Sequence, residues 1–71
     1  MARQGKIYTL IEYEKKFSRK GESRWAFIIR KQKEGLFEGK SIHQVNRDFG
    51  NPERFIVVVY ANGENYYKER V

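Results

Sequence analysis

The sequence predicts a small α+β protein in which two β-hairpins and one short helix form an antiparallel sheet of about four strands, in the order ββαββ. Three observations lead to this prediction: a strand-like alternation over residues 6–33, a helical repeat over residues 41–50, and an apolar run at residues 55–61 followed by an Asn-Gly pair. The 71 residues form one domain, near the lower size limit for a single apolar core. We expect residues 1–5 to be flexible.

The first hairpin is predicted from apolar residues that alternate with polar ones. In residues 6–18 this alternation is typical of a half-buried strand, with the following residues on the expected inner face: Ile7, Thr9, Ile11, Tyr13 and Phe17. Residues 18–23 collect turn-forming and charged residues and predict a basic loop. In residues 24–33 the alternation returns, with an inner face of Trp25, Phe27 and Ile29.

The helix is predicted from a change of period after residue 40. Ile42, Val45 and Phe49 lie at i, i+3 and i+7, which places them on one helical face. Ser41 is suited to the N-cap and Gly50 to the C′ position, and Pro52 follows where the helix must have ended.

The second hairpin is predicted from the turn that divides the C-terminal third of the chain. Residues 55–61 form the most apolar run, and Asn62-Gly63 separates it from residues 64–71. An Asn-Gly pair between strand-like segments is the strongest short-range signal for a hairpin. We expect Phe37, Phe49 and Phe55 in the core around the helix.

One short helix is too small to cover this sheet. The run at residues 55–60 is apolar on both faces, and Leu10, Ala26 and Ile28 are apolar opposite the predicted inner set. The sheet therefore either curls into a small barrel or pairs its second face with another copy in a homodimer.

Composition excludes several functional classes. With no cysteine and one histidine, the chain has no disulfide and cannot build a usual all-protein zinc site. The start of the chain lacks the apolar segment of a signal peptide, and no apolar run reaches the ~20 residues that span a bilayer. We expect a cytoplasmic protein without a membrane partner, metal, cofactor or small-molecule substrate.

Charge is the strongest functional signal. Residues 15–33 hold eight Lys or Arg residues against one acid, Glu22, a formal +7 in a chain whose net charge is +6. A localised basic segment attracts polyanions, and aromatic residues interleaved with it are typical of nucleic-acid binding. The sequence therefore predicts a small non-enzymatic nucleic-acid-binding protein of low sequence specificity, without deciding between DNA and RNA or between single and double strands.

The predicted binding surface is the outward sheet face together with the basic loop. Cations on this surface would neutralise backbone phosphates, and tyrosine rings would stack on bases. The candidate nucleic-acid-binding residues are Tyr8, Lys15, Lys16, Arg19, Lys20, Arg24, Arg30, Lys31, Tyr66, Lys68 and Arg70.

Three alternatives stay open. A protein-interaction module, a regulator or inhibitor, would dock the same basic hairpin on an acidic protein surface. A small ribonuclease would use His43 as an acid or base. The third concerns Gly39-Lys40-Ser41 at the helix start: a nucleotide-binding P-loop fails on spacing, because only three residues separate it from Gly35, but Lys40 and Ser41 could contact one backbone phosphate.

Overall fold

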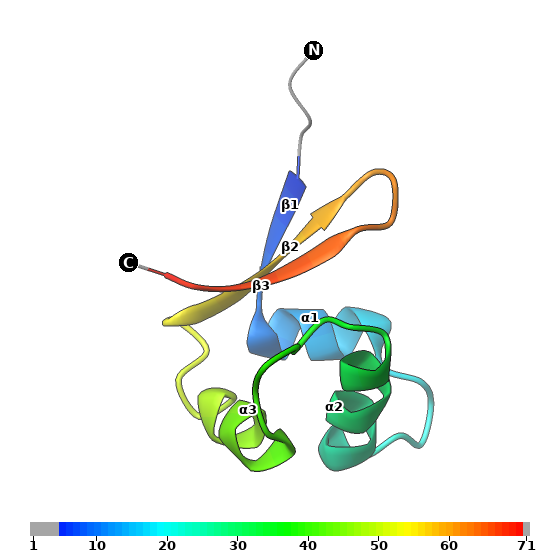
Figure 1. Ribbon diagram of the computed structural model, residues 1–71. Coiled ribbons are helices and arrows are strands. Elements are labelled where there is room, and N and C mark those ends of the chain that lie inside the picture. The colour runs from blue at the N-terminus through cyan, green and yellow to red at the C-terminus, as the bar shows by residue number, and fades with distance from the viewer. Residues whose placement is uncertain (1–4, 71) are drawn as a thin grey trace.

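A three-stranded antiparallel sheet carries three helices on one of its faces (Figure 1). The computed structural model describes residues 5–70. The elements in chain order are β1 (Gly5–Thr9), α1 (Leu10–Phe17), α2 (Arg24–Lys33), α3 (Ile42–Asp48), β2 (Phe55–Tyr60) and β3 (Asn65–Glu69). The central strand is β2, which pairs with β1 on one side and β3 on the other. The fold class is thus confirmed as α+β, whereas within residues 5–70 the sheet has three strands, not four, and is open.

The predicted first hairpin is wrong, because residues 10–33 form two helices rather than two strands. Thr9 ends β1 and caps α1: its hydroxyl accepts a hydrogen bond from the Glu12 backbone N–H at 3.2 Å, and the Glu12 carboxylate accepts one from the Thr9 N–H at 2.9 Å. This reciprocal capping box favours a helix from residue 10. Ser23 caps α2 with a single hydrogen bond, which its hydroxyl accepts from the Ala26 N–H at 3.1 Å.

The helix and the hairpin predicted after residue 40 are confirmed. Ser41 is the N-cap of α3 and accepts a hydrogen bond from the Gln44 N–H, while Gly50 lies one residue beyond the C-cap. Strands β2 and β3 are joined by the Asn62-Gly63 turn, where Gly63 has a φ of +90° that favours glycine.

The two faces of the sheet are the reverse of the prediction at β1. In the register, Tyr8 lies opposite Val57, which lies opposite Tyr67, and this row faces the helices. The adjacent row, through Ile7, faces away. Tyr8 is 9% exposed and Ile7 is 58% exposed, so the predicted outward orientation of Tyr8 is wrong. Gly5 belongs to β1, while the rest of the segment expected to be flexible, residues 1–4, lies outside the described residues.

Aromatic rings dominate the core between the helices and the sheet. Tyr13 of α1 and Phe27 of α2 are fully buried, with ring centroids 5.7 Å apart. The predicted core positions of Phe37, Phe49 and Phe55 are confirmed. Trp25, in contrast, is 40% exposed, so its predicted core position is wrong. The reason is that helical geometry turns Phe27 and Ile28 inward, whereas strand geometry would have placed Trp25 beside Phe27.

A polar network ties the helical layer to the far strand. The Asp48 carboxylate, at the end of α3, lies 2.9 Å from the Lys40 ammonium and accepts a hydrogen bond of 2.5 Å from the Tyr67 hydroxyl. Burial and the hydrogen bond to Asp48 raise the pKa of Tyr67, so the phenol stays protonated and donating at neutral pH. This network holds the loop before α3 against β3.

No helix within residues 5–70 is both long and apolar enough to cross a membrane.

Replacing Asp48 by Ala should lower the free energy of unfolding by about 1–3 kcal/mol, because the Tyr67 hydroxyl and the Lys40 ammonium lose their shared acceptor. Urea denaturation followed by circular dichroism measures this change. Glu53→Ala is the matched control, since Glu53 is exposed, and its effect should stay within about 0.5 kcal/mol. Equal effects of the two substitutions would contradict the assigned role of Asp48.

Candidate nucleic-acid interface

The basic segment predicted from the sequence is divided by the fold into paired, buried and free cations. Arg24 pairs with Glu14, with a closest N–O distance of 3.0 Å, and Arg30 pairs with Glu22 at 2.9 Å. Lys31 is buried, which contradicts its predicted place on the binding surface. Helix α2 turns it inward, where its ammonium lies 5.4–6.0 Å from the centres of three rings, Tyr13, Phe17 and Phe27.

Four predicted binding residues stay exposed and close together, and we call them the α1–α2 corner: Lys15, Lys16, Arg19 and Lys20. The first two lie in the last turn of α1, and the other two lie in the loop of residues 18–23. Within residues 5–70, none of the four forms an ion pair with a carboxylate. The corner therefore presents about four uncompensated positive charges to solvent.

The loop of this corner is held in one conformation by Glu22. Its carboxylate accepts hydrogen bonds from the Arg19 backbone N–H at 2.9 Å and from the Arg30 guanidinium at 2.9 and 3.0 Å. Gly21 supplies the turn with a φ of +80°. Arg30 also donates to the carbonyl of Phe17 at 3.0 Å, so one guanidinium connects the end of α1 to the loop. The corner charges are thus carried on a rigid support.

The first turn of α2 extends this surface toward α3. Trp25 lies on the solvent side of α2, and its indole makes an edge contact with the ring of His43 on α3, with centroids 5.0 Å apart. Arg47 lies one turn after His43 and is exposed, without an ion pair to any carboxylate among residues 5–70. Exposed cations therefore lie on both sides of the α2 N-terminal turn.

Sequence reasoning missed Trp25 and Arg47 as surface candidates. A usable signal was present for Arg47: the helix around it has its apolar face at Ile42, Val45 and Phe49, so Arg47 had to lie on the polar face. For Trp25 the signal required knowing that residues 24–33 are helical.

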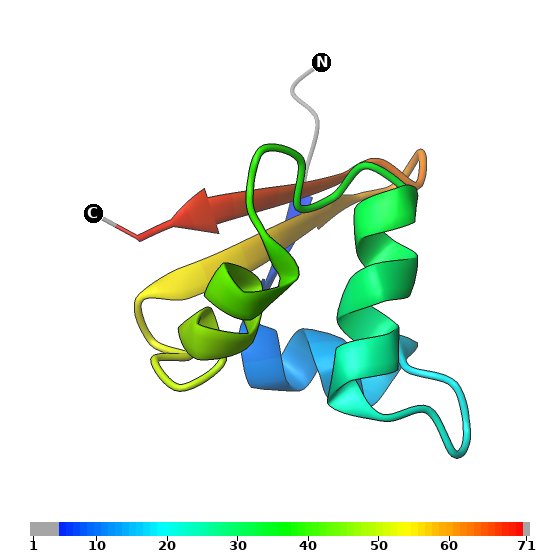
Figure 2. The same cartoon turned by 60° about the horizontal axis from the view of Figure 1, so that its bottom comes forward.

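The remaining predicted residues lie elsewhere. Tyr66, Lys68 and Arg70 are exposed on or just beyond β3. Both views of the chain place the end of β3 and the α1–α2 loop at opposite ends of the molecule (Figures 1 and 2). The structure therefore does not bring the eleven candidates into one surface, and Tyr8 contributes its ring to the core instead.

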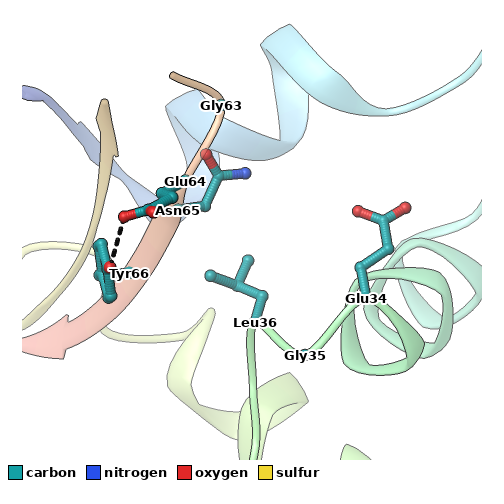
Figure 3. A pocket seen from close by; sticks show the side chains of 7 residues that line it. All are labelled: Glu34, Gly35, Leu36, Gly63, Glu64, Asn65 and Tyr66. Atoms are coloured by element: carbon teal, nitrogen blue, oxygen red, sulfur yellow. Dashed lines mark hydrogen bonds between the residues drawn. The ribbon is translucent and has the colours of Figure 1, made fainter. Parts of the chain in front are cut away.

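An open cleft of about 280 Å³ lies between the end of α2 and the β2–β3 turn (Figure 3). Its lining includes two carboxylates, Glu34 and Glu64, together with Leu36 and Asn65. Carboxylates repel phosphate, so this cleft is unsuited to nucleic acid. Glu34 already pairs with Lys31 at 3.2 Å.

The loop before α3 offers no free lysine for a phosphate. The Lys40 ammonium pairs with Asp48 and lies 4.8 and 4.9 Å from the ring centres of Phe55 and Tyr67. Within residues 5–70, no group of three His, Cys, Asp or Glu side chains is arranged to hold a metal ion.

Comparison with protein-family models, curated proteins and solved structures finds no match for this chain.

The hydrogen bonds that the Glu22 carboxylate accepts from Arg19 and Arg30 predict a specific dependence of the protein's stability on pH. The hydrogen bonds from the Arg30 guanidinium and the Arg19 N–H lower the pKa of Glu22 from 4.5 to about 2. Because the folded value lies below the unfolded one, the stabilisation is present above pH 4.5 and is lost as the pH falls from 4.5 toward 2. Glu22→Gln should therefore be less stable than wild type at pH 7, with a gap that shrinks below pH 4.5.

Urea denaturation at pH 7, 4.5 and 2.5 measures that gap. Glu38→Gln serves as the control, because Glu38 is exposed and its replacement should change the free energy of unfolding by less than about 0.5 kcal/mol. A gap for Glu22→Gln that is constant across the three pH values would contradict the assignment.

Proposed function

We propose that this protein binds nucleic acid without catalysis, through the α1–α2 corner and the adjoining first turn of α2. The observation that carries the proposal is the group of four exposed, uncompensated cations, two in the last turn of α1 and two in the loop whose backbone Glu22 and Arg30 hold. An ordered backbone lowers the entropic cost of bringing these cations to backbone phosphates, and their binding energy comes from the release of counterions.

Double-stranded DNA is the form of nucleic acid that this surface fits best. Helices α1 and α2 are consecutive, cross each other at the loop and are joined by a glycine-containing turn (Figure 2). In helix-turn-helix proteins, the second helix of such a pair enters the major groove and its N-terminal residues approach the base edges. The loop here has six residues, longer than the usual three or four.

The exposed side of α2 is compatible with this placement. Ala26 and Lys33 lie on it and are exposed, and Trp25 lies where this side borders α3, with its ring in contact with His43. A helix with its side chains is about 10–12 Å wide, close to the width of the major groove. Few of these exposed side chains can form paired hydrogen bonds with a base, which supports low sequence specificity.

The sheet surface gives less support to nucleic-acid binding. Tyr8 is buried and cannot stack on a base. Of the predicted aromatic and basic residues on the sheet, this leaves Tyr66 with the two cations that follow it in the chain, Lys68 and Arg70. The enzymatic alternative also gains little, since the ring next to His43 is the indole of Trp25, which has no acid or base chemistry.

Binding should depend on the loop cations in a way that salt reveals. If the four corner residues and Arg47 each neutralise one duplex phosphate, log K should fall against log salt with a slope of about −4.5. Arg19→Gln/Lys20→Gln should reduce the magnitude of this slope by about 2 and weaken binding at least tenfold at 50 mM salt. Fluorescence anisotropy with a labelled 16-base-pair duplex measures both quantities.

The control removes the same charge from the sheet side. Lys6→Gln/Arg70→Gln should retain the wild-type slope, and single-stranded DNA and RNA of equal length should bind more weakly than the duplex. Unchanged binding by the loop variant, or an equal loss in the control, would reject the corner as the interface. Absence of binding to every nucleic acid at 50 mM salt would instead favour an acidic protein as the partner.

The single tryptophan reports on the same contact. Trp25 is exposed in the free protein, so acrylamide should quench its fluorescence efficiently. Duplex binding at α2 should shield the indole and lower the quenching constant about twofold or more. Heparin bound through charge alone serves as the control and should shield it less. Quenching that is the same with and without bound duplex would place the DNA away from α2.

A further inference from the structure

The face of the sheet that points away from the helices is apolar, and none of the helices within residues 5–70 covers it. Helices α1, α2 and α3 all lie on the opposite face (Figures 1 and 2). We call this surface the outer apolar face, and it consists of Ile7, Ile56, Val58, Tyr60 and Tyr66. Ile7 is 58% exposed and Tyr66 is 45% exposed, while Val58, which lies between them in the register, is 8% exposed. Antiparallel sheets with one solvated face normally carry polar residues there, so this composition indicates a surface that is covered in use.

The outer apolar face is closely packed at the start of β1. A Cβ atom on Gly5 would lie 2.5 Å from a methyl carbon of Val58 and 2.9 Å from the ring of Tyr60. Glycine at this position therefore allows the tyrosine ring to lie close against β1. The ring of Tyr60 also meets that of Tyr66, with centroids 5.5 Å apart, which extends the apolar surface across the hairpin.

The outer apolar face has an acidic residue, Glu64, just before β3 and a basic residue, Lys68, near the end of β3. This arrangement makes the face complementary to a second copy of itself. Glu64, Tyr66 and Lys68 lie at alternate positions and hence on the same side, and the Tyr66 hydroxyl donates to the Glu64 carboxylate at 2.6 Å. The order along the strand is thus acid, ring, base. A two-fold axis that runs parallel to the sheet, perpendicular to β3 and above Tyr66, would stack two copies face to face and place each Lys68 over the Glu64 of the other copy.

We propose that a second copy of this chain stacks on the outer apolar face and forms a two-fold dimer. The exposed apolar side chains of Ile7 and Tyr66 argue for an apolar partner. The acid-ring-base order selects an identical copy, because one two-fold operation brings Lys68 of each copy to Glu64 of the other. The free cations of the α1–α2 corner lie on the helical side and do not meet across the interface. The dimer would stand without the proposed nucleic-acid function, and with it would carry one corner on each of its two outer, helical sides.

The size of the face predicts a weak dimer. Strands lie about 4.8 Å apart and rise about 3.4 Å per residue, so three strands of five or six residues offer roughly 14 by 17 Å. The area buried in total then falls below about 1,200 Å², the range of weak and transient interfaces. We expect dissociation constants of about 10 to 100 µM.

Sedimentation velocity from 10 µM to 1 mM in 150 mM salt tests the dimer. The mass should rise from 8.5 kDa toward twice that value. Ile7→Lys should weaken association at least tenfold, whereas Trp25→Lys, which alters an exposed apolar residue on the helical side, should leave it unchanged. A wild type that stays monomeric at 1 mM, or an Ile7→Lys variant that associates as strongly as wild type, would overturn the proposal.

A mixing experiment separates the charge pairing from loss of folding. Lys68→Glu and Glu64→Lys should each weaken self-association, since each places like charges opposite one another across the two-fold axis. An equimolar mixture of the two variants should recover a dimer, because both contacts then join opposite charges. With both variants folded by circular dichroism, a mixture no more associated than its components would overturn this geometry. A monomeric wild type whose Ile7→Lys variant loses duplex binding would assign the face to nucleic acid instead.

Discussion

The guanidinium of Arg30 holds together the part of the molecule on which the rest depends. It donates to the carbonyl of Phe17 at the end of α1, to Glu22 in the loop, and to Glu34 after α2. A guanidinium has five N–H donors in a fixed planar arrangement, so it can direct hydrogen bonds to several groups at once. Its stem lies within the molecule, with the charge 5.5 Å from the ring centre of Phe27. One side chain therefore sets how α1, the loop and α2 meet.

Ion pairs within the helical half explain why few of the basic residues at positions 15–33 remain unpaired. Three acidic residues of the helical half form ion pairs with basic residues of α2: Glu14, Glu22 and Glu34. No acid is left to pair with the last turn of α1 or with the loop among the described residues. The positive potential therefore concentrates at the α1–α2 corner instead of spreading over the surface.

The two sides of the sheet differ in their chemistry for a simple geometric reason. A strand directs successive side chains to opposite faces, and three helices are enough to cover only one face of three strands. β2 is apolar at nearly every position, so its outer residues Ile56 and Val58 have no helix to pack against. The free cations of the α1–α2 corner thus lie on the helical side and the apolar surface lies on the other, so the proposed phosphate contact and the proposed self-association would use different residues.

Local signals in the sequence determined the second half of the fold. Ser41 and Gly50 mark the ends of α3, and Asn62-Gly63 sets the hairpin turn, because capping and turn geometry depend on a few adjacent residues. The basic character of the loop at residues 18–23 was also available from sequence, since these residues connect two elements whether those are strands or helices. Arg19 and Lys20 are therefore exposed as predicted, although the elements on either side of the loop are helices and not strands.

Only the tertiary structure decided the first half. Residues 10–33 fit both a period of two and a helical period: Leu10, Tyr13 and Phe17 share one helical face, while the alternation through Tyr13 also suits a strand. Burial of Tyr13 against Phe27 and the cap at Thr9 favour the helices. Which cations stay free depends on contacts such as Glu14 with Arg24, ten residues apart, and those distances exist only once the helices have packed.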